Sequence, residues 1–157
     1  LFNLEEAYNI CKQIKLLKQE NKKIELLIIT SRRTSKKIKD FLNNELSSIA
    51  NLWLGNGKNP YEFAIYNSKH FIITSDSTSM ISEASISGKP IYVYQLPFKR
   101  KSLRFERFHD EFRKLNITRD LEFTKQLEHW TYNKLDESKR IAGIIKERII
   151  EGINESI

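Results

Sequence analysis

The chain has 157 residues, 39% of them hydrophobic, and a formal net charge of +7 from 27 Lys and Arg against 20 Asp and Glu. Length and composition favour one globular domain and exclude extended disorder. No apolar run reaches the roughly 20 residues of a membrane-spanning helix, and no signal peptide is visible. The positive charge favours anionic partners, although a general use of Lys on solvated faces also explains it.

The chemistry of cysteine and histidine excludes several kinds of site. A single cysteine, Cys11, cannot form an internal disulfide or a cysteine-rich zinc site, and its place on an apolar stripe predicts a buried thiol. This favours a reducing, cytoplasmic compartment. His70, His109 and His129 are far apart and lack metal-ligand spacing, so we predict no metal site and no catalytic triad. We expect His109 to be structural.

The first predicted element is a helix of about 15 residues, since apolar residues recur at helical spacing. This stripe consists of Leu4, Ala7, Tyr8, Cys11, Ile14 and either Leu17 or Leu16. A β-branched run at 24–30 predicts a buried parallel strand. We expect the next helix to turn Ile38, Phe41 and Leu42 inward.

The middle of the chain repeats this alternation. A weaker strand is predicted at 51–54, then a glycine-containing loop at 55–59 and a short helix starting at Pro60. An apolar strand at 70–74 is followed by a hydroxyl-rich turn, a short helix and a second apolar strand at 91–94.

The last third contains a basic loop, a helix, and a segment at 121–130 that no pattern assigns. The apolar residues of this helix are Leu103, Phe105 or Phe108, Phe112 and Leu115. Asp136 is expected to cap a final helix, with Ile141 and Ile145 on its apolar face. Alternating helices and strands predict an α/β fold, a Rossmann-like three-layer α/β/α arrangement with a mostly parallel sheet.

Ligands of such folds bind beyond the carboxyl ends of the strands. Four predicted loops leave strands at that edge: 31–35, 55–61, 75–79 and 96–102. These loops contain the arginine pair, the two loop glycines, the hydroxyl cluster and the basic residues, so we predict a binding site at this edge.

The loop at 75–79 has the most specific pattern. Ser77, Thr78 and Ser79 open a helix, whose first N–H groups lack partners and lie at the positive end of the helix dipole, as at many phosphate sites. The alternative is an ordinary N-cap, but a cap needs one such residue and this turn has several. Glu83 lies one turn further on; it is either a solvated glutamate or a ligand for a ribose. Lys89 is expected to face solvent.

Two basic clusters are candidates for anion binding. Arg32 and Arg33 suit phosphates, although pairing with a carboxylate or full solvation is about equally consistent with their place. The segment Lys99–Arg107 could hold phosphate, RNA or an acidic membrane surface. Its aromatic residues have helical spacing, which favours a core role and disfavours nucleic-acid binding.

Three motifs taken together resemble a known family. They are Ser-Arg-Arg-Thr at 31–34, Asn-Pro-Tyr at 59–61, and Ser-Asp-Ser-Thr-Ser-Met-Ile-Ser-Glu-Ala at 75–84 followed by Gly-Lys-Pro. With Arg104-Phe105 and Phe108-His109, they resemble bacterial-type members of the mitochondrial fission factor family named for elongated mitochondria. The pattern from Glu83 to Pro90 is also similar to the nucleotide-sugar domain of two-domain glycosyltransferases of the GT-B type.

The resemblance implies a site for a nucleoside diphosphate or nucleotide-sugar, with Ser77 to Ser79 on the phosphates and Glu83 on the ribose. The expected ligand-binding residues are Arg32, Arg33, Asn59, Tyr61, Ser77, Thr78, Ser79 and Glu83. No cofactor is implied, and the catalytic residues of such enzymes usually belong to the other domain.

We therefore expect residues 1–157 to form a single Rossmann-like domain, the C-terminal part of a longer two-domain protein. Any enzyme activity would be glycosyl transfer of the GT-B type that needs the other domain. The alternative is a non-enzymatic interaction module, because plant members of the family are associated with recruiting a dynamin-related protein to mitochondria. The expected location is cytoplasmic, or peripheral on a membrane.

Overall fold

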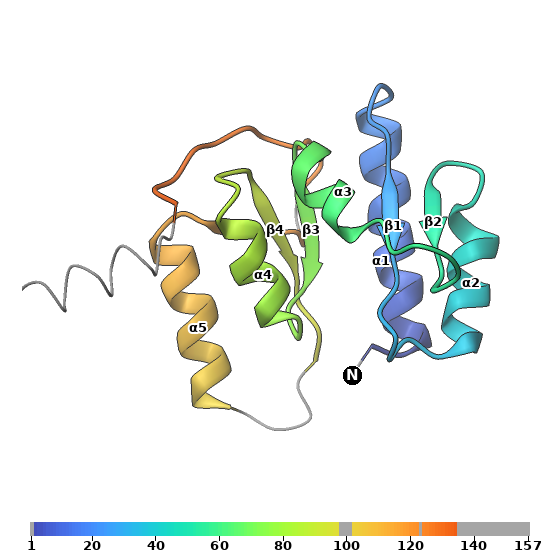
Figure 1. Ribbon diagram of the computed structural model, residues 1–157, viewed down its shortest axis with the longest axis horizontal. Coiled ribbons are helices and arrows are strands. Elements are labelled where there is room, and N and C mark those ends of the chain that lie inside the picture. Colours follow the sequence, from blue (N-terminus) through green and yellow to red (C-terminus); the bar gives the residue numbers. More distant parts are fainter. Residues whose placement is uncertain (1, 98–101, 123, 135–157) are drawn as a thin grey trace, which may run out of the picture.

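The computed structural model describes residues 2–97, 102–122 and 124–134. Helices and strands alternate along it (Figure 1): α1 (Leu4–Glu20), β1 (Leu27–Ile29), α2 (Lys36–Leu46), β2 (Asn51–Trp53), α3 (Tyr61–Asn67), β3 (Phe71–Thr74), α4 (Thr78–Ser85), β4 (Ile91–Tyr94), α5 (Leu103–Lys114) and β5 (Thr118–Asp120). The helix predicted after Asp136 lies outside the described residues.

The strands form two sheets, one with the order β1-β2 and one with the order β3-β4-β5, and every pairing is parallel. The predicted α/β fold with parallel strands is confirmed. β5 was not predicted, because the sequence Thr-Arg-Asp contains no apolar run. In Figure 1 β1 and β3 both run from the top of the view to the bottom, so their carboxyl ends lie at the same end of the molecule.

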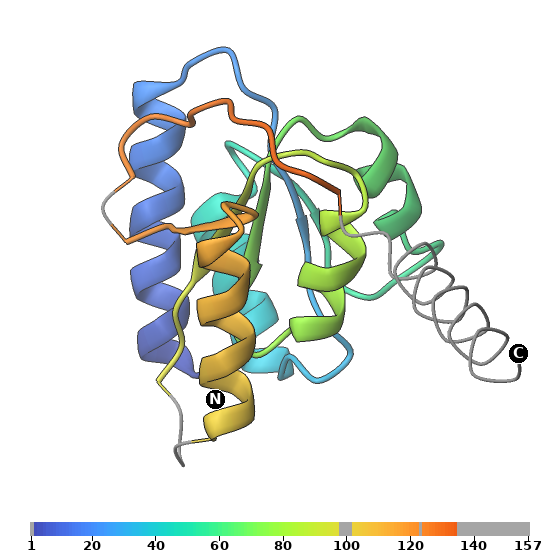
Figure 2. The same cartoon turned by 90° about the vertical axis from the view of Figure 1, so that its left-hand side faces the viewer.

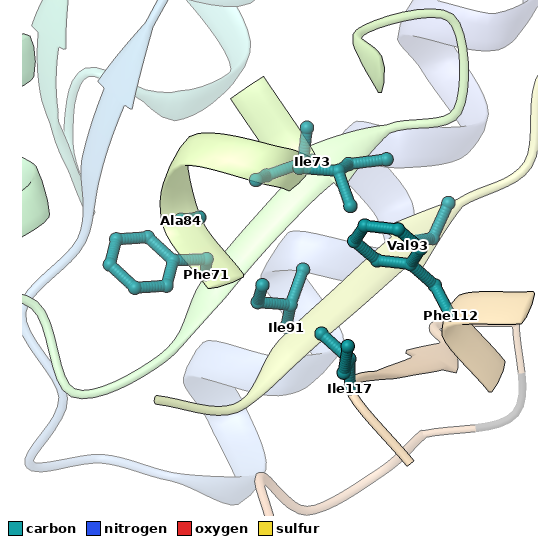
Figure 3. Close-up of a cluster of buried hydrophobic side chains, with 8 residues drawn as sticks. Phe71, Ile73, Ala84, Ile91, Val93, Phe112 and Ile117 are labelled. Atoms are coloured by element: carbon teal, nitrogen blue, oxygen red, sulfur yellow. The ribbon is translucent and has the colours of Figure 1, made fainter. Parts of the chain in front are cut away.

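Side chains alternate along the strands of the three-stranded sheet, so apolar residues point to both of its faces. Other elements pack on each face. Phe71 and Ile73 of β3 and Ile91 and Val93 of β4 share one face (Figure 3). They pack there against α4 and α5; the helical partners are Ile81, Ala84 and Phe112, with Ile117 just before β5. This cluster forms the hydrophobic core between the three-stranded sheet and the helices α4 and α5. Leu103 at the start of α5 and Leu115 just after its end are 68% and 47% exposed, so the predicted apolar stripe is buried only in its middle.

The long helix α1 covers the other face and reaches both sheets; Figure 2 shows it and α4 on opposite sides of the strands. Leu17 packs with Tyr92 of β4, while Ile14 packs in a cluster with α2 and Ile28 of β1. Buried Cys11 confirms the prediction for this thiol. The prediction for Tyr8 was wrong: its side chain is 59% exposed, since it lies beside the stripe that packs.

Residues 124–134 cross the α1 side of the sheet, where Trp130 contacts Tyr92 edge to face at 5.1 Å. The indole Nε1 of Trp130 donates to the carbonyl of Asn116 (2.9 Å), and the Tyr132 hydroxyl donates to the carbonyl of Lys89 (2.8 Å). Tertiary contacts therefore order a segment that has no periodic pattern. Within the described part of the chain, no helix has the length and apolar character needed to cross a bilayer.

Candidate functional site at the carboxyl ends of the strands

The turn between β3 and α4 is anchored by Ser75, which is fully buried. Its N–H donates to the carbonyl of Tyr94, and its hydroxyl accepts from the N–H of Leu96, both at 2.9 Å. Its carbonyl accepts from Nε2 of His109 at 2.9 Å. The start of α4 is therefore held by the end of β4 and by α5.

His109 is buried, and its role is structural, as predicted. A carbonyl oxygen only accepts, so the ring carries its proton on Nε2 in this bond. Burial lowers the pKa of His109 below its usual value, an effect that the bond to Ser75 opposes. The ring is thus a neutral donor that fixes the turn.

The first turn of α4 is open to a ligand. Ser77 is its N-cap residue, and the Ser77 side chain makes no capping hydrogen bond. Asp76 accepts from the Thr74 hydroxyl at 2.8 Å, so this carboxylate is tied to the end of β3. Ser77 and Thr78 are partly buried and Ser79 is exposed. Uncapped N–H groups of this kind can bind an oxyanion.

The structure brings two of the predicted residues together. The Tyr61 hydroxyl, at the start of α3, donates to Oε2 of Glu83 on α4 at 2.7 Å. Tyr61 is partly buried and Glu83 is exposed. Burial, then the hydrogen bond to Glu83 and its negative charge, raise the pKa of Tyr61 above its usual value. The phenol therefore stays a donor to the carboxylate.

The loop before Tyr61 has a defined conformation. Gly55 and Gly57 have φ values of 108° and 73°, which side-chain-bearing residues rarely adopt. Asn59 lies at the end of this loop, and its Oδ1 accepts from the N–H of Tyr61 at 3.0 Å. Asn59 therefore orders the start of α3, and its place offers a structural explanation for the Asn-Pro-Tyr motif.

The two predicted arginines directly follow the carboxyl end of β1. Arg32 and Arg33 form a turn after β1, in the two-stranded sheet, and both are exposed. The Ser31 hydroxyl accepts from the N–H of Arg33 at 2.9 Å. Among described residues, neither guanidinium forms a salt bridge. Within the described ranges, no hydrogen bond or salt bridge joins either side chain to Glu83, and both side chains are accessible to an anion.

The basic segment is described only in part, because residues 99–101 lie outside the described ranges. Arg104 and Arg107, in the first turns of α5, are exposed. Cations at a helix N-terminus oppose the helix dipole. An anionic partner would offset this unfavourable interaction, so the placement of the two side chains is compatible with one. Binding to an acidic membrane surface stays a prediction.

The prediction that Lys89 faces solvent was wrong. Its ammonium donates to the carbonyls of Ile65 (3.0 Å) and Tyr66 (2.7 Å), the last turn of α3, instead of facing solvent alone. Burial lowers the pKa of Lys89, with a smaller effect from the charge of Lys134. No local pattern signals this contact, which joins the turn after α4 to α3.

The candidate site is an open edge. Two surface depressions lie at the opposite end of the strands; the larger, of about 470 Å³, lies between the last turns of α1 and α2 and includes Lys15 and Glu45. Among described residues, no three His, Cys, Asp or Glu side chains are grouped to hold a metal ion. The arrangement offers backbone donors, hydroxyls and two carboxylates, of which Asp76 is bonded to Thr74 and Glu83 to Tyr61.

Comparison with known proteins places the chain in a family. A family model described as Mitochondrial fission ELM1 matches residues 2–149. The chain belongs to this family. An uncharacterized protein of Rickettsia prowazekii (strain Madrid E) is 34% identical to this ELM1-family chain over 131 residues, which cover 80% of the chain and 37% of that protein.

A second relative of this ELM1-family chain is the Arabidopsis thaliana protein named Mitochondrial fission protein ELM1. It is 28% identical over 125 residues, covering 78% of the chain and 29% of that protein. The chain thus spans about a third of the length of these curated relatives. No solved structure matches the chain.

Proposed function

We propose that this domain binds a nucleoside diphosphate, the nucleotide part of a nucleotide-sugar, at the carboxyl end of β3. The observation that carries the proposal is the uncapped, hydroxyl-rich start of α4, which Ser75 and His109 hold in place. Donors fixed before a ligand arrives bind anions with a smaller loss of freedom. The diphosphate would lie on the turn Ser77–Ser79.

Glu83 supports a nucleotide rather than a free phosphate as the ligand. It follows Ser79 by four residues, which is about 6 Å along a helix axis. A carboxylate at that distance can accept from the hydroxyls of a ribose attached to the diphosphate. This division of roles resembles the GT-B nucleotide-sugar domain.

The proposed activity, if the whole protein is an enzyme, is glycosyl transfer. The domain would contribute by orienting the donor and by stabilising the negative charge of the leaving diphosphate. Because the matched regions cover only 37% and 29% of the two relatives, the acceptor side and the catalytic base would come from other parts of the protein.

The test is ligand-dependent stability. A nucleoside diphosphate at 100 times its Kd should stabilise the folded state by about 2.7 kcal/mol. Ser79→Asp should abolish this gain, because a carboxylate there repels the diphosphate, while it leaves the free domain as stable or more stable through its interaction with the helix dipole. Ser48→Asp, an exposed serine beyond α2, is the matched control and should leave the gain intact.

Two results would contradict this proposal. If UDP, GDP, ADP, CDP and inorganic pyrophosphate all leave the melting temperature unchanged at millimolar concentration, the proposal is wrong. If Ser79→Asp keeps the full gain, the ligand binds elsewhere on the chain.

A second candidate is a protein-interaction module, and exposed apolar side chains favour it. Phe63 and Tyr66 on α3 are 63% and 79% exposed, and Ile86 after α4 is 61% exposed. The name of the Arabidopsis relative is compatible with a role in mitochondrial fission. Partner binding that is lost in the double variant Phe63→Ser, Tyr66→Ser and kept in Glu83→Ala would favour this candidate over the first.

A further inference from the structure

Glu83 is an exposed side chain that is restrained by a hydrogen bond to Tyr61. Within the described part of the chain, the Tyr61 hydroxyl is the hydrogen-bond partner of its carboxylate, at 2.7 Å to Oε2. A glutamate without such a contact samples many rotamers and loses that freedom when it binds a ligand. The bond to Tyr61 restricts the carboxylate before binding.

Tyr61 is itself held in place at both ends of its helix. Asn59 accepts from its N–H at 3.0 Å, and Lys89 donates to the carbonyls of Ile65 and Tyr66 in the last turn of α3. α3 is therefore anchored near Glu83 at its start and near the α4–β4 turn at its end. A phenol on such a helix is a fixed reference point for the carboxylate.

The bond leaves the carboxylate able to bind a diol. A carboxylate has about four lone-pair sites on its two oxygens, and Tyr61 uses one of them on Oε2. Oε1 remains available, and Oε2 keeps a second site, so two neighbouring hydroxyls can still be bound together. Contact with Tyr61 and contact with a ribose are thus compatible.

We infer that Tyr61 is a positioning residue, whose hydroxyl orients the Glu83 carboxylate toward the ribose hydroxyls of a bound nucleotide. This inference rests on the proposed nucleoside-diphosphate site. It assigns Tyr61 to the orientation of Glu83 instead of direct ligand contact. It also explains why the Gly55–Asn59 loop has a defined conformation, since that loop sets the position of Tyr61.

The test compares ligands with and without a ribose on the full chain. The probes are the nucleoside diphosphate that binds most tightly among UDP, GDP, ADP and CDP, and inorganic pyrophosphate. Tyr61→Phe removes one hydroxyl and should weaken the nucleoside diphosphate about tenfold, as expected for loss of one hydrogen bond to a charged group. Pyrophosphate affinity should not change. Tyr66→Phe, an exposed tyrosine on the same helix, is the matched control and should change neither affinity.

A double-mutant cycle distinguishes positioning from a general structural effect. In a Glu83→Ala background, Tyr61→Phe should cause no further loss of nucleoside-diphosphate affinity, because Tyr61 acts through Glu83. An additional tenfold loss in that background overturns the inference.

Three further results would contradict the inference. If Tyr61→Phe binds the nucleoside diphosphate as the wild type does, or loses pyrophosphate affinity equally, Tyr61 does not position Glu83. If the wild type binds pyrophosphate but gains nothing from the ribose, the inference fails while the phosphate site stands. If the wild type binds neither probe, the proposed function fails and the inference with it.

Discussion

His109 donates from Nε2 to the carbonyl of Ser75 at 2.9 Å, and this buried bond ties α5 to the turn that opens α4. The same serine accepts from the N–H of Leu96 through its hydroxyl. Three segments of the chain thus meet at one small residue. A change at Ser75 or His109 should therefore alter both the stability of the domain and the geometry of the proposed site.

Ser75→Ala should destabilise the fold by about 1–3 kcal/mol, since it leaves the buried N–H of Leu96 without an acceptor. Urea denaturation measures the change. Ser48→Ala, at an exposed position, should stay within about 0.5 kcal/mol of the wild type. Equal stability of the two variants would show that the bond to Leu96 contributes little.

His109→Gln should flatten the pH dependence of stability. Burial lowers the pKa of His109 in the folded state, so the unfolded chain binds the proton more readily. The free energy of unfolding of the wild type should therefore decrease as the pH falls below about 6.5, the usual histidine value. Glutamine can keep the donor but does not titrate.

Denaturation between pH 5.5 and 7.5 measures this slope. Ser48→Gln, at an exposed position without a titrating group, should keep the wild-type slope. Some slope should remain in His109→Gln, because burial also lowers the pKa of His70. An unchanged slope in His109→Gln contradicts the assignment.

Glu83→Ala should lower the pKa of Tyr61. The carboxylate favours the protonated phenol through its hydrogen bond and its charge, and both are lost in the variant. The pKa should stay above the usual value of about 10, because the burial of Tyr61 remains. NMR titration of the labelled tyrosine ring carbon, assigned with Tyr61→Phe, measures the shift. Glu62→Ala removes a neighbouring exposed carboxylate and should leave the pKa of Tyr61 nearly unchanged.

Cys11 should be inert in the folded protein. Burial, with a smaller effect from the charge of Glu45, raises the pKa of the thiol to about 11. Since the thiolate is the reactive form, a thiol reagent at pH 8 should modify Cys11 only after denaturation. An engineered exposed thiol, Ser48→Cys, should react at once under native conditions. Equal native rates at both positions would contradict the burial of Cys11.

Much of the fold follows from local sequence patterns. The order from β3 through α4 to β4 was predicted, since short apolar runs and the polar turn between them are local signals. Tyr8 was misplaced because it neighbours Ala7 on the helix, and only the surrounding elements decide which side is covered. β5 was missed because its pairing with β4, and not its composition, makes it a strand.

Local patterns were enough to predict the succession of elements, the buried thiol and the hydroxyl-rich turn at the start of a helix, because these features depend on residues near one another in the chain. The division of the strands into two sheets, the contact of Lys89 with the end of α3 and the bond between Tyr61 and Glu83 became visible only in the folded chain. The last two contacts join residues more than 20 positions apart. They depend on how the helices pack around the strands, which local patterns do not encode.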